Sequence, residues 1–270
     1  MTRWIAGLPM YDFPEIREAT DKFWSLIAAE LRARGLDHIP AHLERPDDLP
    51  AFWSGPDLLF GQTCGYPLSI GLCGEAQLVA TPIYHAPGCE AHRYGSWLVV
   101  PATSEWHDLR DTQGRICAMN SSDSNTGMNL LRASIAAIGG KAPFYSQTIE
   151  TASHRKSLVM VAKGEADIAA IDQVSFAHFL RLEPDVAKAV RVIGETAKTP
   201  GLPFITSAST SAQHLTILRE ALASVIQHKP RHTCLNTLFL SDIAIVPRDD
   251  YREISDLAVR AAQSGYPVLA

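Results

Sequence analysis

The chain has 270 residues, of which 46% are hydrophobic and 20% are charged, and its formal net charge is −5. This composition is ordinary for a globular protein with a large core, and the length suits two domains or one fold in two lobes. The acidic balance and the lack of a Lys/Arg run argue against a nucleic-acid groove, and no stretch approaches the roughly 20 apolar residues of a membrane span.

The five cysteines are scattered, odd in number and without a C-x-x-C pair, which predicts reduced thiols in a reducing compartment. The N-terminal residues lack a basic region, an apolar core and a small-residue cleavage site of the kind that signal peptides carry. We therefore expect a cytoplasmic chain, with a periplasmic location as the alternative if a leader has been removed.

The first predicted elements alternate between strand and helix. Residues 4–8 are expected to form a strand, residues 19–34 an amphipathic helix, and residues 57–61 a short buried strand. This alternation favours a largely parallel α/β sheet. Tyr11 and Tyr66 follow the two strands, and each offers an aromatic wall and a phenolic donor. The alternative is that each tyrosine only packs over its loop.

The rest of the chain continues the alternation. Strands are expected at 96–100, 115–119, 166–171, 190–194, 204–206 and 243–246, and helices at 126–138, 153–163, 174–182, 212–226 and 251–263. Ligands of parallel α/β sheets bind beyond the carboxyl ends of the strands. Four loops are predicted there: residues 9–12, 62–67, 121–127 and the point around Asp172.

The loop at residues 121–127 is rich in hydroxyl side chains and leads into a predicted helix. The first turn of a helix offers unpaired backbone N–H groups and the positive end of the helix dipole. Ser124 and Thr126 add hydroxyl donors, and Gly127 allows a ligand to approach the backbone closely. The sequence predicts a site for a tetrahedral oxyanion here, with simple helix capping as the alternative.

Two further polar residues accompany this loop. His154 stands at the start of a predicted helix, where a cation opposes the helix dipole, so its presence favours an anion in front of it. The alternative is an exposed loop histidine. Asp172 ends a buried strand, where a carboxylate needs a partner. It is expected to accept a proton-bearing ligand oxygen, to bind a ligand amine, or to cap the helix that follows.

Several motifs, in this order, resemble the phosphate-, phosphite- and phosphonate-binding family of solute receptors of ABC importers over about residues 55–210. They are Asp108-Leu109-Arg110, Ser124-Asn125-Thr126-Gly127, Ser153-His154, the run from Lys163 to Asp172, and the run from Arg191 to Pro203. The resemblance implies an α/β fold of the type II periplasmic-binding-protein kind, with a ligand cleft between two lobes and two crossover strands as a hinge. Lobe one would hold residues 1–97 and 195–270, and lobe two residues 98–194.

The resemblance also implies the site, the ligand and the partner. The ligand-binding residues would be Tyr11, Tyr66, Ser124, Asn125, Thr126, Gly127, His154 and Asp172. The ligand would be a small oxyanion of the phosphate, phosphite or phosphonate class, bound by hinge closure without a cofactor, a metal or a catalytic residue. The partner would be the membrane component of an ABC importer. The chain departs from the family by reading Asn125-Thr126 where a Ser-Thr-Ser-like run is usual.

Other functions compete with a receptor. Cytoplasmic enzymes of menaquinone and thiamine-pyrimidine biosynthesis use the same fold, so one alternative is an enzyme acting on an organic acid or phosphate ester, with His154 or Asp172 as general acid/base. Another is a cytoplasmic sensor read by a partner protein. His85, Cys89 and His92 could ligate zinc, although their spacing fits no standard template. Cys64 with His154 as its base is a further candidate pair.

Overall fold

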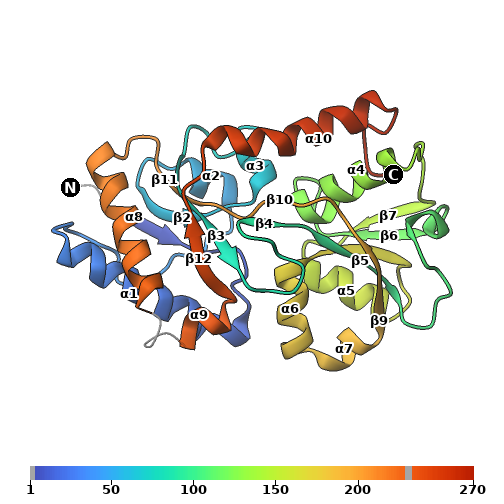
Figure 1. The fold of residues 1–270 in the computed structure, drawn as a ribbon, viewed down its shortest axis with the longest axis horizontal. Coiled ribbons are helices and arrows are strands. Elements are labelled where there is room, and N and C mark those ends of the chain that lie inside the picture. Colours follow the sequence, from blue (N-terminus) through green and yellow to red (C-terminus); the bar gives the residue numbers. More distant parts are fainter. Residues whose placement is uncertain (1–3, 229–232) are drawn as a thin grey trace. The chain divides into compact units, whose positions relative to one another are not determined.

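The computed structural model describes residues 4–228 and 233–270, which divide into two compact α/β units (Figure 1). Unit 1 comprises Met1–His85, Glu90–His92 and Pro200–Tyr251, and unit 2 comprises Ala86–Cys89, Arg93–Thr199 and Arg252–Ala270. Each unit is therefore built from segments that are distant in the sequence. The expected α/β fold in two lobes is confirmed at this level.

Unit 1 has a five-stranded sheet in the order β1-β2-β11-β3-β12. Its strands are β1 (Ile5–Gly7), β2 (Leu58–Gln62), β3 (Gln77–Tyr84), β11 (Phe204–Thr206) and β12 (Leu240–Ala244). Its helices are η1 (Pro14–Ile16), α1 (Arg17–Ala33), α2 (Leu49–Ser54), α3 (Gly65–Ser69), α8 (Ala212–Gln227), α9 (Thr233–Thr237) and η5 (Arg248–Tyr251). Phe60 of β2 stacks on Trp24 of α1 and on Phe204 of β11, so aromatic rings join helix and sheet in the core.

Unit 2 has a five-stranded sheet in the order β7-β6-β8-β5-β9. Its strands are β5 (Ser96–Pro101), β6 (Ile116–Met119), β7 (Gln147–Glu150), β8 (Ile168–Asp172) and β9 (Val190–Glu195). Its helices are η2 (Leu109–Thr112), the π-helical turn η3 (Asn125–Asn129), α4 (Leu130–Ala137), α5 (His154–Ala162), α6 (Gln173–Leu182), α7 (Pro184–Lys188) and α10 (Arg252–Gln263). A separate two-stranded sheet pairs β4 (Arg93–Tyr94) with β10 (Thr199–Pro200).

Both large sheets are mixed, so the expectation of a largely parallel sheet is wrong. In unit 1, β1 runs parallel to β2, whereas β11 and β12 pair antiparallel with their neighbours. In unit 2, β6 runs parallel to β7 and β8, whereas β5 runs antiparallel to β8 and β9. A strand that is buried on both faces is a run of apolar residues whether it pairs parallel or antiparallel. The sequence pattern therefore did not indicate the direction of these strands.

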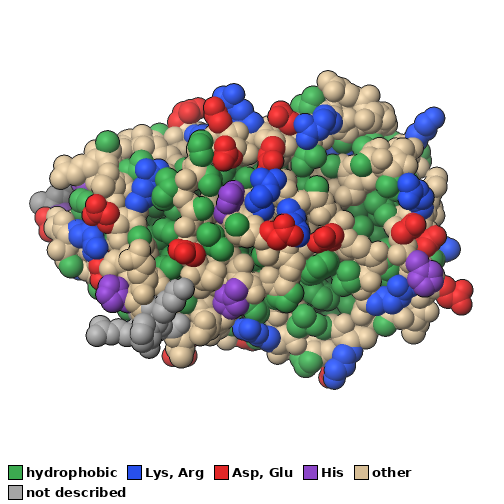
Figure 2. Space-filling view, in the orientation of Figure 1, with side chains coloured by type: hydrophobic (Ala, Val, Ile, Leu, Met, Phe, Trp, Pro, Cys, Tyr) green, Lys and Arg blue, Asp and Glu red, His purple; other side chains and the backbone are tan. Residues whose placement is uncertain are grey.

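The C-terminal helix belongs to unit 2, where α10 packs against α4. The resemblance placed residues 195–270 in lobe one, and these lobe boundaries stay a prediction. No helix among the described residues is long and apolar enough to cross a membrane. On the face drawn in Figure 2, Lys/Arg and Asp/Glu side chains are interspersed, without a continuous basic surface.

Candidate functional site

Three polar loops of unit 2 leave the same edge of its sheet. Strands β6, β7 and β8 run parallel, so their carboxyl ends lie together. The loop after β6 carries residues 121–127, the loop after β7 carries Ser153 and His154, and β8 ends in Asp172. The structure thus brings together all the residues that the sequence predicted for the anion site in this unit.

The loop after β6 is followed by the π-helical turn η3 and then by α4, and the sequence analysis did not predict this turn. The Asn129 N–H donates to the Ser124 carbonyl at 3.0 Å, which closes the wider turn. Ser124 caps the turn, because its Oγ accepts from the Gly127 N–H at 3.0 Å. A helix start leaves its first N–H groups without helical acceptors, and the wider π turn adds one more. The Ser124 side chain therefore does act as a helix cap, and the turn that it caps is buried.

Only glycine fits at position 127 of this turn, because there is no room for a side chain. A Cβ at this position would lie 1.8 Å from Asn120 Oδ1 and 3.1 Å from His154 Cε1. The Asn120 Oδ1 atom is itself buried and has no hydrogen-bond partner among the described residues. The backbone of the loop therefore packs directly against both neighbours, and any side chain at position 127 would push them away.

His154 is the first residue of α5, and its ring lies against the loop. Its Nε2 atom is 3.1 Å from Thr126 Oγ1 and 3.5 Å from Asp172 Oδ2. Burial lowers the pKa of His154, and the Asp172 carboxylate and the Ala170 backbone only partly oppose this. The imidazole is therefore neutral at pH 7, which suits a ring at a helix N-terminus. The exposed-loop alternative is wrong, because the side chain is only 12% exposed.

Asp172 divides its two carboxylate oxygens between two tasks. Oδ1 accepts from the N–H groups of Val174 and Ser175, at 3.0 and 2.9 Å, and so caps α6. Oδ2 is the atom that faces His154. The cap and the position at the site are therefore compatible, as the sequence allowed. A carboxylate at this point repels a fully deprotonated anion and favours a ligand that brings a proton or an amine.

The arrangement of Thr126, His154 and Asp172 differs from that of a nucleophilic triad. In such a triad the hydroxyl and the carboxylate contact opposite ring nitrogens, so that the carboxylate orients the base. Here both groups approach the same Nε2 atom. Because Asp172 is not placed on the opposite nitrogen to orient a base, the arrangement suits ligand binding better than proton abstraction from Thr126.

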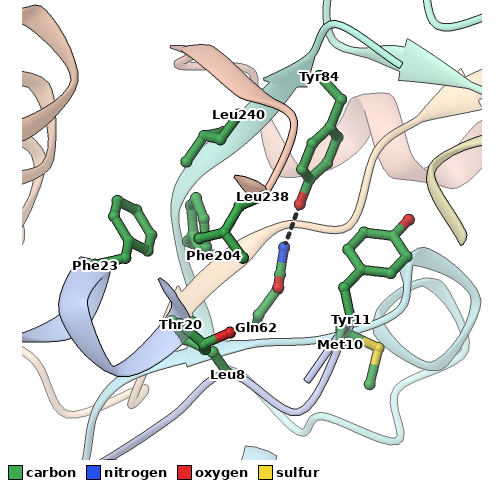
Figure 3. A pocket seen from close by; sticks show the side chains of 10 residues that line it. All are labelled: Leu8, Met10, Tyr11, Thr20, Phe23, Gln62, Tyr84, Phe204, Leu238 and Leu240. Atoms are coloured by element: carbon green, nitrogen blue, oxygen red, sulfur yellow. Dashed lines mark hydrogen bonds between the residues drawn. The ribbon is translucent and has the colours of Figure 1, made fainter. Parts of the chain in front are cut away.

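The predicted tyrosines both lie in unit 1, at the edge where β1 and β2 end. Figure 3 shows Tyr11 beside a small pocket with Tyr84 and Gln62. The rings of Tyr11 and Tyr84 meet edge to face at 5.6 Å, and Gln62 Nε2 donates to the Tyr84 hydroxyl at 2.9 Å. Tyr11 adopts φ 60°, a left-handed conformation that is uncommon for a tyrosine.

Tyr66 lies in α3, half-buried, and is not among the residues that line the Tyr11 pocket. Because the two tyrosines belong to unit 1, their predicted contacts with a ligand held by unit 2 stay a prediction. No sequence signal singled out Tyr84, which is a fully paired strand residue at the end of β3.

The alternative metal site finds no geometric support. Within residues 4–228 and 233–270, no three His, Cys, Asp or Glu side chains form a group that could hold a metal ion. His85 instead packs its ring against Phe239 at 5.4 Å. No disulfide joins the cysteines of the described residues. Cys64 belongs to unit 1 and His154 to unit 2, so the proposed nucleophile and base stay a prediction.

Sequence reasoning missed the polar residues that hold the loop from below. Ser96 is fully buried at the start of β5, paired with Asp172 in the sheet, and its Oγ donates to the Thr126 carbonyl at 2.8 Å. Asn129 is buried at the end of η3, and Arg132 is buried in α4. A polar residue at an inward-facing position of a strong apolar element is the signal that could have identified all three.

Three solved structures are similar to this chain over nearly its whole length. A binding-protein component of an ABC phosphonate transporter from Pseudomonas aeruginosa aligns with a TM-score of 0.76 at 14% identity, covering 97% of this chain and 87% of that one. PhnD1 from Prochlorococcus marinus, in complex with methylphosphonate, aligns with a TM-score of 0.74 at 14% identity, covering 97% and 100%. The chloride-bound protein XAC2383 from Xanthomonas citri aligns with a TM-score of 0.74 at 13% identity, covering 98% and 99%. At these identities the likeness establishes the fold, which is of the type II periplasmic-binding-protein kind.

No curated protein matches the chain in sequence. A family model does match, over residues 69–251, and its description is the phosphonate periplasmic substrate-binding protein of ABC transporters. This match covers about two thirds of the chain and includes the loop, His154 and Asp172. Membership implies a small-molecule ligand and an ABC importer partner. The chain belongs to the family of periplasmic substrate-binding proteins of phosphonate ABC transporters.

Proposed function

We propose that this protein binds a small tetrahedral oxyanion of the phosphonate, phosphite or phosphate class at the carboxyl edge of the unit 2 sheet, as the receptor of an importer. One observation carries the proposal: the Thr126 hydroxyl, the His154 ring and the start of the η3 turn lie together beside Gly127. Hydroxyl and backbone donors bind such anions well, because hydrogen bonds to a charged oxygen are about twice as strong as neutral ones.

The site contains no Lys or Arg at the loop itself, so the proton content of the ligand becomes important. Asp172 Oδ2 stands 3.5 Å from His154 Nε2 and adds negative charge beside the site. A phosphonate or phosphate that keeps one proton can donate it to this carboxylate, whereas sulfate has none to donate at neutral pH. We expect the site to prefer proton-bearing oxyanions, or those with an amine, over sulfate.

The contributions of Tyr11 and Tyr66 are part of the same proposal. Each would add a phenolic donor from unit 1. Where the protein works in the cell is also open to test: the family is described as periplasmic, and the cytoplasmic location predicted above stays a prediction. Fractionation of cells that express the native gene, followed by detection of the mature chain, distinguishes the two locations.

The binding test uses thermal shift and calorimetry with phosphate, phosphite, methylphosphonate, 2-aminoethylphosphonate and sulfate. A ligand that binds only the folded state raises the unfolding temperature by mass action, so millimolar affinities are still detected. The double variant Ser124→Ala/Thr126→Ala removes the cap and the hydroxyl at His154, and it should lose binding altogether while it still folds. Loss of one N-cap costs about 1 kcal/mol, which a protein of this size tolerates.

The matched control is Thr103→Ala/Ser146→Ala, which removes one threonine and one serine hydroxyl from exposed positions of the same unit. It should bind like the wild type. Unchanged binding in the Ser124→Ala/Thr126→Ala variant would contradict the assignment of this site, and sulfate binding as tightly as methylphosphonate would contradict the role of Asp172.

A further inference from the structure

Arg132 is a buried cation just behind the proposed anion site. It lies in α4 and is only 7% exposed. Its Nη1 donates to the Pro267 carbonyl at 2.6 Å and its Nη2 donates to Asn129 Oδ1 at 3.0 Å. Its Nε is buried and has no acceptor among the described residues. All the hydrogen-bond partners of this guanidinium are neutral, and none of the ion pairs within the described residues includes it.

A line of side-chain amides connects this cation to the loop. The Asn129 Oδ1 that accepts from Arg132 belongs to a fully buried amide, whose Nδ2 donates to Asn125 Oδ1 at 3.2 Å and to the Ile254 carbonyl at 2.9 Å. The Asn125 Nδ2 in turn donates to Thr199 Oγ1 at 2.9 Å. Both amides therefore point their oxygens toward Arg132 and their N–H groups away from it, an orientation in which hydrogen bonds polarise one another.

An unpaired buried charge is expensive, so a protein retains one where something compensates it. Arg132 stands six positions after Thr126, which is about 9 Å along a helix, and helical side chains lean toward the N-terminus. A bound oxyanion in front of the η3 turn would supply such an opposite charge. At a separation on the order of 10 Å and an effective dielectric constant of about 20, the attraction corresponds to roughly a tenfold change in affinity.

We propose that Arg132 is a positioning residue that supplies the missing positive charge of the oxyanion site, through Asn129 and Asn125. The inference rests on the proposed function of the loop. The competing role is purely structural, because Arg132 also ties the C-terminal segment to α4 through Pro267, and the nearby Ala270 carbonyl accepts from the Phe144 N–H at 2.7 Å. The two roles predict different orders among substitutions at position 132.

The test compares Arg132→Lys, Arg132→Gln and Arg132→Met by calorimetry with methylphosphonate, and by thermal unfolding without ligand. Lysine keeps the charge and loses the planar fork, whereas glutamine keeps hydrogen-bonding capacity and loses the charge. If charge matters, Arg132→Lys binds within about threefold of the wild type, and Arg132→Gln and Arg132→Met bind roughly tenfold more weakly. If only Arg132→Lys keeps the affinity for methylphosphonate, the positive charge of residue 132 is what the site needs.

A second variant guards against failure to fold at position 132. Asn129→Asp places a carboxylate beside the guanidinium and should weaken methylphosphonate binding at least as much as Arg132→Gln, because it neutralises the charge that reaches the loop. Asn129→Asp also loses the two hydrogen bonds that Asn129 Nδ2 donates to Asn125 Oδ1 and to the Ile254 carbonyl, so thermal unfolding without ligand measures this structural loss separately from the loss of affinity. Binding that follows unfolding temperature across all four variants, or wild-type affinity in Arg132→Gln and Asn129→Asp, would overturn the inference.

The two levels of the proposal fail in different ways. If the wild-type protein binds none of the oxyanions in the panel, the proposed function itself is contradicted. If the wild type binds and Ser124→Ala/Thr126→Ala does not, while the position 132 variants bind like the wild type, only the inference about Arg132 falls.

Discussion

In each unit, parallel strands end at one edge of the sheet. The side chains at this edge are mostly apolar and uncharged in unit 1, but polar in unit 2. In unit 1 the pocket beside β1 and β2 is lined by apolar side chains, tyrosines, Thr20 and Gln62, without a charged residue. In unit 2 the corresponding edge carries hydroxyls, a neutral imidazole, a carboxylate and the start of a helix. The same topological position therefore gives an anion site only where helix N-termini and donors converge on it.

The difference also shows in how each edge is supported. Under the unit 2 loop lie the buried hydrogen bonds of Ser96, Asn125 and Asn129. The pocket beside Tyr11 in unit 1 is lined by apolar side chains such as Phe23 and Leu240. A site that must hold charge needs polar support with fixed geometry, because reorganising dipoles would weaken each charge-assisted bond.

The largest effect is expected from Gly127→Ala, which attacks the unit 2 edge directly. The added Cβ would meet Asn120 Oδ1 at 1.8 Å, so the loop or Asn120 must move. We expect oxyanion affinity to fall more than a hundredfold and the free energy of unfolding to fall by about 1–3 kcal/mol, as for other overpacked sites. Calorimetry and urea unfolding measure the two effects.

Two companions to this variant separate crowding from other causes. Gly194→Ala, in β9 of the same unit, places its Cβ 3.7 Å from Leu98 Cδ1, an ordinary contact, and should change neither quantity. Asn120→Ala combined with Gly127→Ala removes the obstructing amide and should restore most of the stability. If Gly127→Ala alone binds normally, the close packing of the loop has no role in the site.

The second largest effect is expected from buried histidines of unit 2, which should lower the free energy of unfolding at acidic pH. His178 of α6 is 1% exposed, and burial lowers its pKa to about 4, while burial also lowers the pKa of His154. The unfolded chain takes up these protons near pH 6.5 and the folded chain does so only at lower pH. The free energy of unfolding should therefore fall as the pH falls from about 6.5 toward 4, by roughly 3 kcal/mol for His178 at most.

Urea unfolding at pH 7, 6 and 5 measures this dependence. His178→Gln removes the titrating ring and should flatten the curve, whereas His107→Gln removes an exposed histidine of the same unit and should leave it unchanged. A wild-type slope in His178→Gln would show that the acid sensitivity has another source.

The sequence predicted the elements whose apolar pattern is strong, and it predicted the polar loops that follow them. Helix α1 and strands β2, β6 and β8 appear within two residues of their expected ends. Strand β3 was missed, because the polar and proline residues of Gln77–Tyr84 hide its pattern. Strand direction and the partner of α10 were not predictable either, since both depend on contacts between distant segments.

At the candidate site, the residues expected to touch a ligand were easier to predict than those that support them. Ser124, Thr126, His154 and Asp172 stand out because polar residues follow apolar strands. The π turn, the fit of Asn120 against Gly127 and the buried Arg132 do not, since each is a matter of three-dimensional packing. In the sequence, Arg132 looks like an ordinary polar residue of a helix. Only the structure shows that its guanidinium is buried without an acidic partner among the described residues.

The smallest effect is expected at the unit 1 edge, from Tyr11→Phe. This variant keeps the ring that meets Tyr84 edge to face and removes one phenolic donor. A single hydrogen bond to a charged oxygen contributes about 1.5 kcal/mol or more, so we expect methylphosphonate affinity to fall about tenfold, with little change in stability. Tyr251→Phe is the matched variant, because its hydroxyl bonds Thr81 and the Gly201 carbonyl within unit 1 and should lower stability without changing affinity. If Tyr11→Phe binds as tightly as the wild type, the Tyr11 hydroxyl donates nothing to the anion, and Tyr66 is the remaining predicted donor of unit 1.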